Sequence, residues 1–119
     1  MTALMQIVEQ RVGDVTILRL AGRLELDDGD FILRDHVNGL VEEGRLNVVL
    51  DMKDVTSLDS AGIGVLVSKF LTVSRRGGAI KLLHLTDRTR RLLHITKLDT
   101  VFETFEDESE AVHSFGITV

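Results

Sequence analysis

The stretch Leu50-Asp-Met-Lys-Asp-Val-Thr-Ser-Leu-Asp59-Ser60-Ala-Gly-Ile-Gly-Val-Leu66 decides the fold and points to the functional site. An apolar strand ends in Asp51, a short polar loop follows, and Asp59-Ser60-Ala61-Gly62 opens a helix. Ser60 falls in the first turn of that helix, where unpaired N–H groups and the positive end of the helix dipole favour a phosphate on its hydroxyl. Asp59 or Ser60 also fits a purely structural cap, so both interpretations stay open here.

Strand and helix patterns alternate along the rest of the chain. Strands are expected at residues 5–11, 15–20, 46–52, 79–85 and 101–105. Helices are expected at residues 29–43, 60–76, 87 to about 97, and 107–115, with Thr86 as a cap. The order β-β-α-β-α-β-α-β-α predicts a single α/β domain over residues 1–119, with helices packed on a mixed, mostly parallel sheet of four to five strands.

The predicted sheet also places the candidate site. Loops that leave the carboxyl ends of parallel strands gather on one rim of such a sheet. Here that rim carries residues 21–28, 53–59 and 86–87.

Composition excludes several classes of function. The chain has 119 residues, a formal net charge of −5, five Phe, and no Cys, Trp or Tyr. Without Cys there is no disulfide framework or thiol nucleophile, and the acidic balance and scarce aromatic residues argue against nucleic-acid binding. No apolar run approaches a membrane span, and residues 1–6 lack the pattern of a signal peptide. We therefore expect a cytoplasmic protein that binds neither membrane nor nucleic acid.

Two glycines in one helical turn, Gly62 and Gly64, need an explanation because each costs about 1 kcal/mol relative to alanine inside a helix. They fit either a smooth surface for a docking partner or close packing against a neighbouring element. Val65 and Ser68 fall off the apolar stripe formed by Ile63, Leu66, Val67, Phe70 and Leu71, so they would extend a docking face.

Acidic residues gather on the predicted rim. They are Asp51, Asp54 and Asp59, with Glu25, Asp27 and Asp28 opposite. A solvated set of loops explains them better than a site for a divalent cation, because no dense acidic ligand loop is present. A phosphate on Ser60 would add about −1.5 to −2 charges beside these acids, so a partner that tolerates the neutral hydroxyl would be expelled.

Other candidate sites have ordinary structural explanations. The four histidines, His36, His84, His94 and His113, show no ligand spacing. Arg88, Arg90 and Arg91 with Lys97 form a basic helix, for which a solvated face is the default interpretation. Leu58 stands where a serine-hydrolase nucleophile elbow needs glycine, so we expect no enzyme of that class.

Several motifs in series resemble the STAS domain of bacterial anti-sigma factor antagonists. The motifs are Leu20-Ala-Gly-Arg-Leu24, Val48-Val-Leu-Asp-Met52, Asp59-Ser-Ala-Gly-Ile-Gly64, Ile80-Lys-Leu-Leu83, and Arg90-Arg-Leu-Leu-His-Ile-Thr-Lys-Leu98 leading into Val101-Phe-Glu-Thr-Phe105. The resemblance covers nearly the whole chain, and the Asp-Ser-x-Gly-x-Gly element is its most specific part.

This resemblance implies a partner-switching protein. In the family, the unphosphorylated antagonist binds an anti-sigma factor that is also a serine kinase, and a sigma factor is freed. The kinase phosphorylates the serine after the aspartate, here Ser60, and a serine phosphatase resets the system. The antagonist is not an enzyme and holds no cofactor, since ATP and Mg²⁺ belong to the kinase.

The resemblance and the helix pattern together give the residues expected at the partner interface. Asp59, Ala61, Gly62 and Gly64 would frame the phosphosite, and Thr56 and Ser57 would sit in a docking loop. The full expected set is Glu25, Thr56, Ser57, Asp59, Ser60, Ala61, Gly62, Gly64 and Val65.

Two departures from the family pattern concern Arg23 and Lys97. Some members have Gly-Glu-Leu-Asp where this chain has Gly22-Arg23-Leu24-Glu25, so Arg23 reverses a charge that affects partner choice. Many members have Thr-Gly-Leu where this chain has Thr96-Lys97-Leu98, so Lys97 must end a helix without the conformational freedom of glycine.

Two alternative functions remain. One is a non-switching STAS subunit of a signalling or transport assembly, whose sequence would look almost the same. The other is a receiver-like domain phosphorylated on Asp51, but Glu9-Gln10-Arg11 does not supply the paired acids that hold Mg²⁺ in such domains.

Overall fold

The computed structural model describes residues 5–116. The start of the chain, on which the signal-peptide expectation depends, lies largely outside this range. Within it the strands are β1 (Gln6–Val12), β2 (Val15–Leu24), β3 (Asn47–Leu58), β4 (Ala79–Leu83) and β5 (Thr104–Phe105). The helices are α1 (Gly29–Glu42), α2 (Ser60–Arg75), α3 (Asp87–Ile95) and α4 (Glu108–His113), with a 3-10 turn η1 (Leu98–Thr100).

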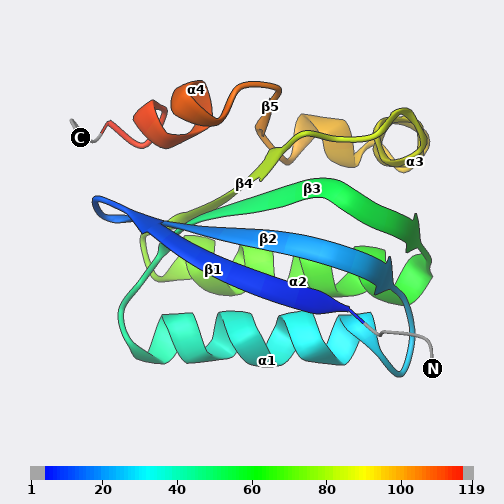
Figure 1. Cartoon of the computed structure of the whole chain (residues 1–119), viewed down its shortest axis with the longest axis horizontal. Helices are drawn as coiled ribbons and strands as arrows, with labels where there is room; N and C mark the ends of the chain where they lie inside the picture. The colour runs from blue at the N-terminus through cyan, green and yellow to red at the C-terminus, as the bar shows by residue number, and fades with distance from the viewer. Residues whose placement is uncertain (1–4, 117–119) are drawn as a thin grey trace.

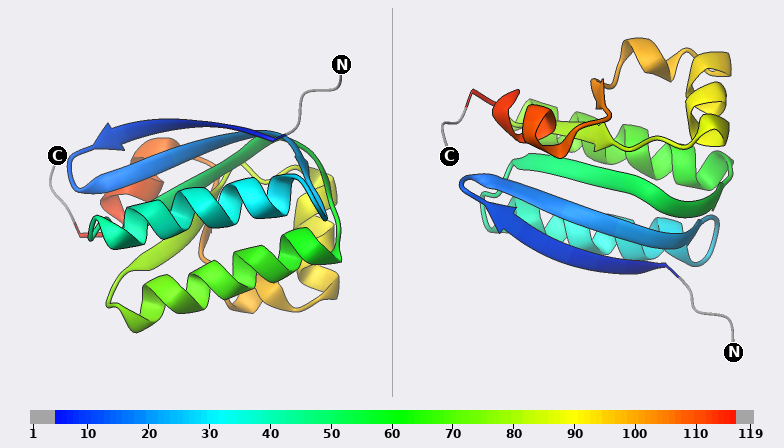
Figure 2. Two further views of the ribbon diagram at one scale, coloured as in Figure 1. Left: turned by 90° about the horizontal axis from the view of Figure 1, so that it is seen from below. Right: turned by 45° about the horizontal axis from the view of Figure 1, so that its top comes forward.

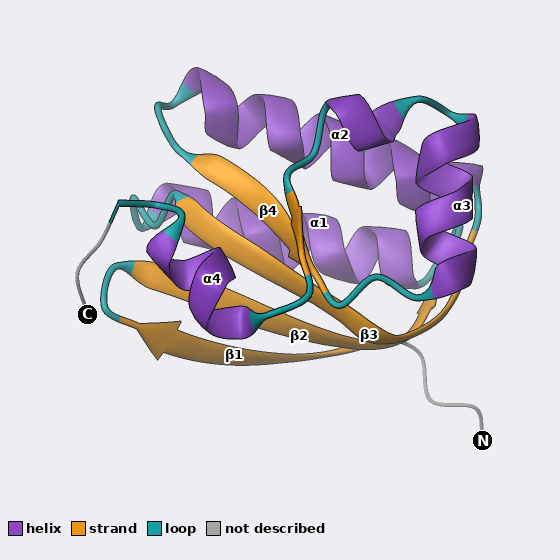
Figure 3. Cartoon of the chain, turned by 90° about the horizontal axis from the view of Figure 1, so that it is seen from above, coloured by secondary structure: helices purple, strands orange, loops and turns teal. Residues whose placement is uncertain are grey.

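The strands lie in the sheet in the same order as in the sequence, β1-β2-β3-β4-β5. β1 and β2 form an antiparallel hairpin across Gly13, whose φ of +60° suits a tight turn, and the later neighbours pair in parallel. α1 and α2 lie side by side beneath the sheet, whereas α4 lies over its other face and α3 stands beside the strand ends (Figures 1, 2 and 3). The predicted α/β fold with a mixed sheet is confirmed.

Helices on both faces of the sheet explain the apolar run of β3. Val48 and Leu50 face the larger core, which α1 and α2 close, while Val49 faces a smaller core that includes Ala111 and Val112 of α4. Because both faces of the strand are buried, successive residues are all apolar and the sequence shows no alternation of polar and apolar residues.

The strands β2 and β3 are longer than predicted, and this changes the rim. β2 continues to Leu24 and β3 to Leu58, and the two stay paired to their ends through two register shifts. Lys53 and Asp54 are both exposed, whereas the following Val55 is buried. The expected end of the strand at residue 52 was wrong because exposed charges along an uncovered part of the sheet look like a loop in sequence.

The helices follow the prediction more closely. Thr86 caps α3 as expected, since its side chain accepts a hydrogen bond from the Thr89 N–H at 3.2 Å. Lys97 adopts the left-handed conformation, with φ +63°, at the position where many members of the resembled family have glycine. Each helix within residues 5–116 is too short or too polar to cross a bilayer.

Candidate functional site

Asp59 caps helix α2 and leaves Ser60 exposed. Its Oδ1 accepts the Gly62 N–H at 2.9 Å, so the capping interpretation holds for Asp59. Its Oδ2 accepts the Leu26 N–H at 3.1 Å. Hydrogen bonds from the Gly62 and Leu26 N–H groups lower the pKa of Asp59, so the cap is ionised at neutral pH. Ser60 is the first residue of the helix and its side chain faces solvent.

The ends of β2 and β3 bring two predicted interface residues into contact. The Ser57 hydroxyl donates to Glu25 Oε2 at 2.8 Å, and the Asp59 N–H points to the Leu24 carbonyl oxygen at 3.4 Å. Thr56 and Ser57 belong to strand β3, so their expected place in a loop was wrong. They still lie at the same rim as Ser60, because the strand ends one residue before the cap.

Gly62 and Gly64 have different surroundings, although they share a helical turn. A Cβ on Gly62 would stand 2.1 Å from the Leu24 carbonyl oxygen, so this buried glycine allows α2 to approach the end of β2. A Cβ on Gly64 would meet nothing within 4 Å, and the residue is exposed. Close packing therefore explains Gly62, and an open surface remains only at Gly64.

The predicted position of Val65 on the exposed face of α2 was wrong. Its side chain is 0% exposed and belongs to the main core, whereas Leu71, which was assigned to the apolar stripe, is 42% exposed. Ala61 is half-buried, and Thr56 and Ser68 are exposed. On α2 itself, the exposed positions after Ser60 in its first three turns, Gly64 and Ser68, carry small residues.

Asp51 does not belong to the rim with which it was grouped. It lies within β3, is 3% exposed, and accepts hydrogen bonds from Arg19 at 2.9 Å and from the His84 ring at 3.0 Å. Burial alone would raise its pKa, but hydrogen bonds from the Lys53 N–H, His84 and Arg19 together hold the pKa below its usual value. Arg19 also contacts Glu108 of α4 at 2.9 Å, so this network ties β2, β3 and the loop after β4 to a helix.

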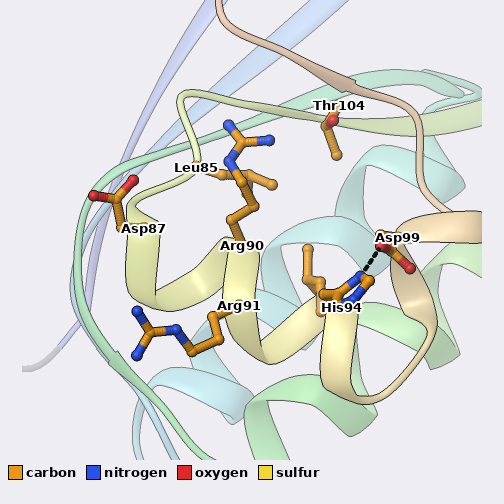
Figure 4. Close-up of a pocket in the computed structure, with 8 residues that line it drawn as sticks. Leu85, Asp87, Arg90, Arg91, His94, Asp99 and Thr104 are labelled. Carbon is orange, nitrogen blue, oxygen red and sulfur yellow. Dashed lines mark hydrogen bonds and ion pairs between the residues drawn. The ribbon is translucent and has the colours of Figure 1, made fainter.

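A separate hollow of about 580 Å³ lies between α3 and its neighbours (Figure 4). Arg90 and Arg91 border it, and the His94 ring pairs with Asp99 at 2.9 Å. Arg90 also pairs with Glu106 at 3.2 Å, outside this hollow. Among residues 5–116 no three His, Asp or Glu side chains are grouped so as to hold a metal ion.

Comparison with known proteins identifies the family of this chain. Residues 6–111 match the model of the STAS domain. The anti-sigma-B factor antagonist of Bacillus subtilis is 33% identical over 96 residues, which cover 81% of this chain and 85% of that protein.

Two solved structures share the fold. The crystal structure of an anti-sigma factor antagonist from Mycobacterium paratuberculosis superposes with a TM-score of 0.83 at 18% identity, covering 95% of each chain. The Bacillus cell fate determinant SpoIIAA in its phosphorylated form gives a TM-score of 0.72 at 17% identity, covering 92% of this chain and 98% of that one. With an antagonist relative at 33% identity and a family match over nearly its whole length, this chain belongs to the STAS domain family.

Proposed function

We propose that this protein is an anti-sigma factor antagonist that switches partners through phosphorylation of Ser60. The unphosphorylated form binds an anti-sigma factor with serine kinase activity, and a sigma factor is thereby released. ATP and Mg²⁺ serve the kinase, a serine phosphatase restores the hydroxyl, and the antagonist itself catalyses no reaction. The Bacillus subtilis relative, which is named an anti-sigma-B factor antagonist, supports the antagonist role in this proposal.

The exposure of Ser60 immediately after the Asp59 cap is the observation that carries the proposal. A hydroxyl at the first residue of a helix is open to an approaching kinase. The Asp59 carboxylate already occupies the Gly62 N–H at this helix start. A phosphate on Ser60 would therefore add its charge to an existing negative charge, and Glu25, which accepts a hydrogen bond from Ser57, adds another on the same rim.

Electrostatic repulsion explains how such a phosphate would release the partner. Neutral Ser60 and the open surface at Gly64 allow close approach of another protein. The phosphate brings about −1.5 to −2 charges to this surface. Ser60 docks beside the nucleotide of the kinase, so the new phosphate faces the nucleotide phosphates, and the like charges repel the partner that had accepted the hydroxyl. The helix dipole favours a phosphate at this end, so we expect little change of fold.

The surroundings of Asp51 favour serine over aspartate as the phosphorylated residue. The Asp51 carboxylate is buried and engaged by Arg19 and His84. A receiver-like mechanism needs that carboxylate to reach a phosphoryl donor. The phosphate bond also distinguishes the two chemistries, because phosphoserine survives acid and hydroxylamine, whereas an acyl phosphate does not.

Mass spectrometry tests the site. The protein is incubated with ATP, Mg²⁺ and each kinase-type anti-sigma factor of its host, and intact mass and peptide mapping follow. We expect a single acid-stable phosphate on Ser60 from one kinase and none on Ser60→Ala. A phosphate on another residue would contradict the assignment of the site.

Binding measurements test the switch. Ser60→Glu adds a negative charge, and Ser60→Gln adds a side chain of the same size without the charge. We expect Ser60→Glu to lose the anti-sigma factor and Ser60→Gln to keep most of the affinity. If Ser60→Glu binds like the wild type, the chain is a non-switching STAS subunit of a larger assembly.

A further inference from the structure

We propose that Leu26 and Phe31 are apolar anchors that insert into a hydrophobic socket with a basic rim on the partner protein. This inference rests on the proposed function. In that function Ser60 controls whether the partner binds, and the inference adds the surface that supplies the binding affinity. Leu26 lies in the loop between β2 and α1, and Phe31 lies in the first turn of α1.

Both side chains face solvent to an extent that folding does not explain. Leu26 is 62% exposed and Phe31 is 64% exposed. Within residues 5–116 four large apolar side chains are more than 60% exposed, and two of them, Leu26 and Phe31, lie only five positions apart beside the candidate site. Large apolar and aromatic side chains that fill pockets supply most of the energy at protein interfaces.

The backbone holds both anchors in place before any partner arrives. The Leu26 N–H donates to Asp59 Oδ2 at 3.1 Å. This hydrogen bond fixes the Leu26 backbone beside Asp59, which caps α2 and precedes Ser60. The Phe31 N–H donates to Asp30 Oδ1 at 2.8 Å, and Asp30 is buried. The Asp30 N–H in turn donates to the Glu25 carbonyl oxygen at 3.1 Å. A backbone that is already ordered loses less conformational entropy on binding.

The helix geometry directs Phe31 toward the start of α2. Phe31 precedes Asn38 by seven residues, which is nearly two turns, so the two share one face of α1. Asn38 faces α2, because its Oδ1 accepts a hydrogen bond from Lys69 Nζ at 2.7 Å. α1 and α2 lie side by side (Figure 2, left). Phe31 therefore lies on the α2 side of α1, two turns nearer the end where Ser60 begins the second helix.

The charges around the anchors define the chemistry of the partner. Asp27 and Asp54 are exposed near this rim, and Glu25 and Asp28 are half-buried. The exposed Arg23 and Lys53, which neighbour them in the sequence, offset two of these four negative charges, so the balance stays acidic. A socket for Leu26 and Phe31 should therefore carry lysine or arginine around an apolar centre. A second copy of this chain fits poorly, because its own acidic rim would face this one at a net charge of −5 per chain.

The test compares anchor variants with matched exposed residues elsewhere. Leu26→Ala pairs with Val8→Ala on β1, which is also 62% exposed, and Phe31→Ala pairs with Ile95→Ala on α3, which is 68% exposed. Dissociation constants are measured for the unphosphorylated proteins against each kinase-type anti-sigma factor of the host, with Ser60→Glu in parallel. Thermal unfolding verifies that each variant is folded.

We expect each anchor variant to bind at least tenfold more weakly and each control to stay within twofold of the wild type. Binding should also weaken as salt rises, since the rim contacts are ionic. If Ser60→Glu abolishes binding while the anchor variants match their controls, the inference is wrong and the proposed function stands. If the anchors matter and Ser60→Glu binds normally, the docking surface stands and the switch is wrong.

Two further results would overturn the inference. If the wild type binds no anti-sigma factor of this kind, the anchors lose their partner and the inference fails together with the proposed function. A wild-type dimer in analytical ultracentrifugation that Phe31→Ala dissociates would assign the surface to a second copy instead.

Discussion

Gly62 and Gly64 show how one turn of helix combines a packing requirement with an open surface. The close approach of α2 to the Leu24 carbonyl group depends on the missing side chain of Gly62. Nothing in the fold requires the missing side chain of Gly64. Their substitution by alanine should therefore have opposite effects on stability.

We expect Gly62→Ala to lower the free energy of unfolding by about 2 kcal/mol, because the new methyl group would force α2 away from β2. Gly64→Ala should raise it by up to about 1 kcal/mol, because alanine favours the helix. Urea denaturation of the two variants measures both effects. Equal effects of the two substitutions would contradict the different packing of these glycines.

Lys97 stores strain at the end of α3. Its φ of +63° is unfavourable for a side chain with a Cβ, so Lys97→Gly should raise the free energy of unfolding by about 0.5 to 1 kcal/mol. Lys97→Ala is the control, because it removes the charge and keeps the Cβ. A higher melting temperature for Lys97→Gly alone would confirm the strain, and an equal rise in both variants would point to the charge.

At the scale of the elements, Asp51 on β3 joins β2 through Arg19 and the loop that follows β4 through His84. Asp51→Asn keeps the size of the side chain and removes its charge. Since Arg19 stays about one-third exposed and can be hydrated, we expect a loss of roughly 2 kcal/mol at pH 7.

The pH dependence of stability follows from the lowered pKa of Asp51. A carboxylate with a depressed pKa stabilises the fold above the pKa of the unfolded chain, near 4, and this contribution disappears as the pH falls through the folded value. The stability difference between the wild type and Asp51→Asn should therefore shrink below about pH 4. Urea denaturation from pH 7 to pH 3 measures it, with the exposed Asp14→Asn as control. A constant difference over this range would contradict the assignment.

Local patterns predicted most of the secondary structure, but they could not predict what covers each face. The two long helices end within one residue of their predicted bounds, because caps and glycines mark them. Asp54 and Thr56 resembled a loop, because the sheet is open to solvent where they lie. The buried face of α2 includes Gly62 and Lys69, which are not apolar side chains. The apolar pattern therefore indicated a different buried face, and Val65 was wrongly predicted to be exposed.

The same limit applies to the candidate site. Sequence predicted a cap at Asp59 or Ser60 and placed Ser60 in the first helical turn, since both follow from local rules, and the structure assigns the cap to Asp59. It could not predict the contact between Glu25 and Ser57, because these residues are 32 positions apart in the sequence. It also missed the exposure of Leu26 and Phe31, because an apolar side chain in sequence is normally assigned to a core.

At the scale of the whole molecule, α4 is a short helix held by a small core and by Lys81. Lys81 is buried on β4, and its Nζ donates to the Ser114 carbonyl oxygen at 3.1 Å and to Ser114 Oγ at 2.9 Å. The ammonium group also lies 4.4 Å from the centre of the Phe115 ring. A helix of six residues is marginal alone, so these contacts decide whether it stays docked.

We expect Lys81→Met to release α4 without opening the larger core. Hydrogen exchange of amides in Glu108–His113 should become at least tenfold faster, corresponding to about 1.4 kcal/mol, while amides of α1 and α2 keep their protection. The exposed Lys53→Met serves as control. Uniform acceleration over the whole chain would show that α4 and the main core open together.

The sequential strand order of the sheet bears on how the chain folds. Each strand after the first pairs with the strand immediately before it in the chain, so no pairing has to wait for a later strand. Only the β1–β2 hairpin is local, because the parallel pairs are separated by a helix or a longer connection, so we expect the hairpin to form first. During synthesis, β3 would meet a completed β1–β2 hairpin, and β4 would meet a completed β3, so every new strand finds its template already in place.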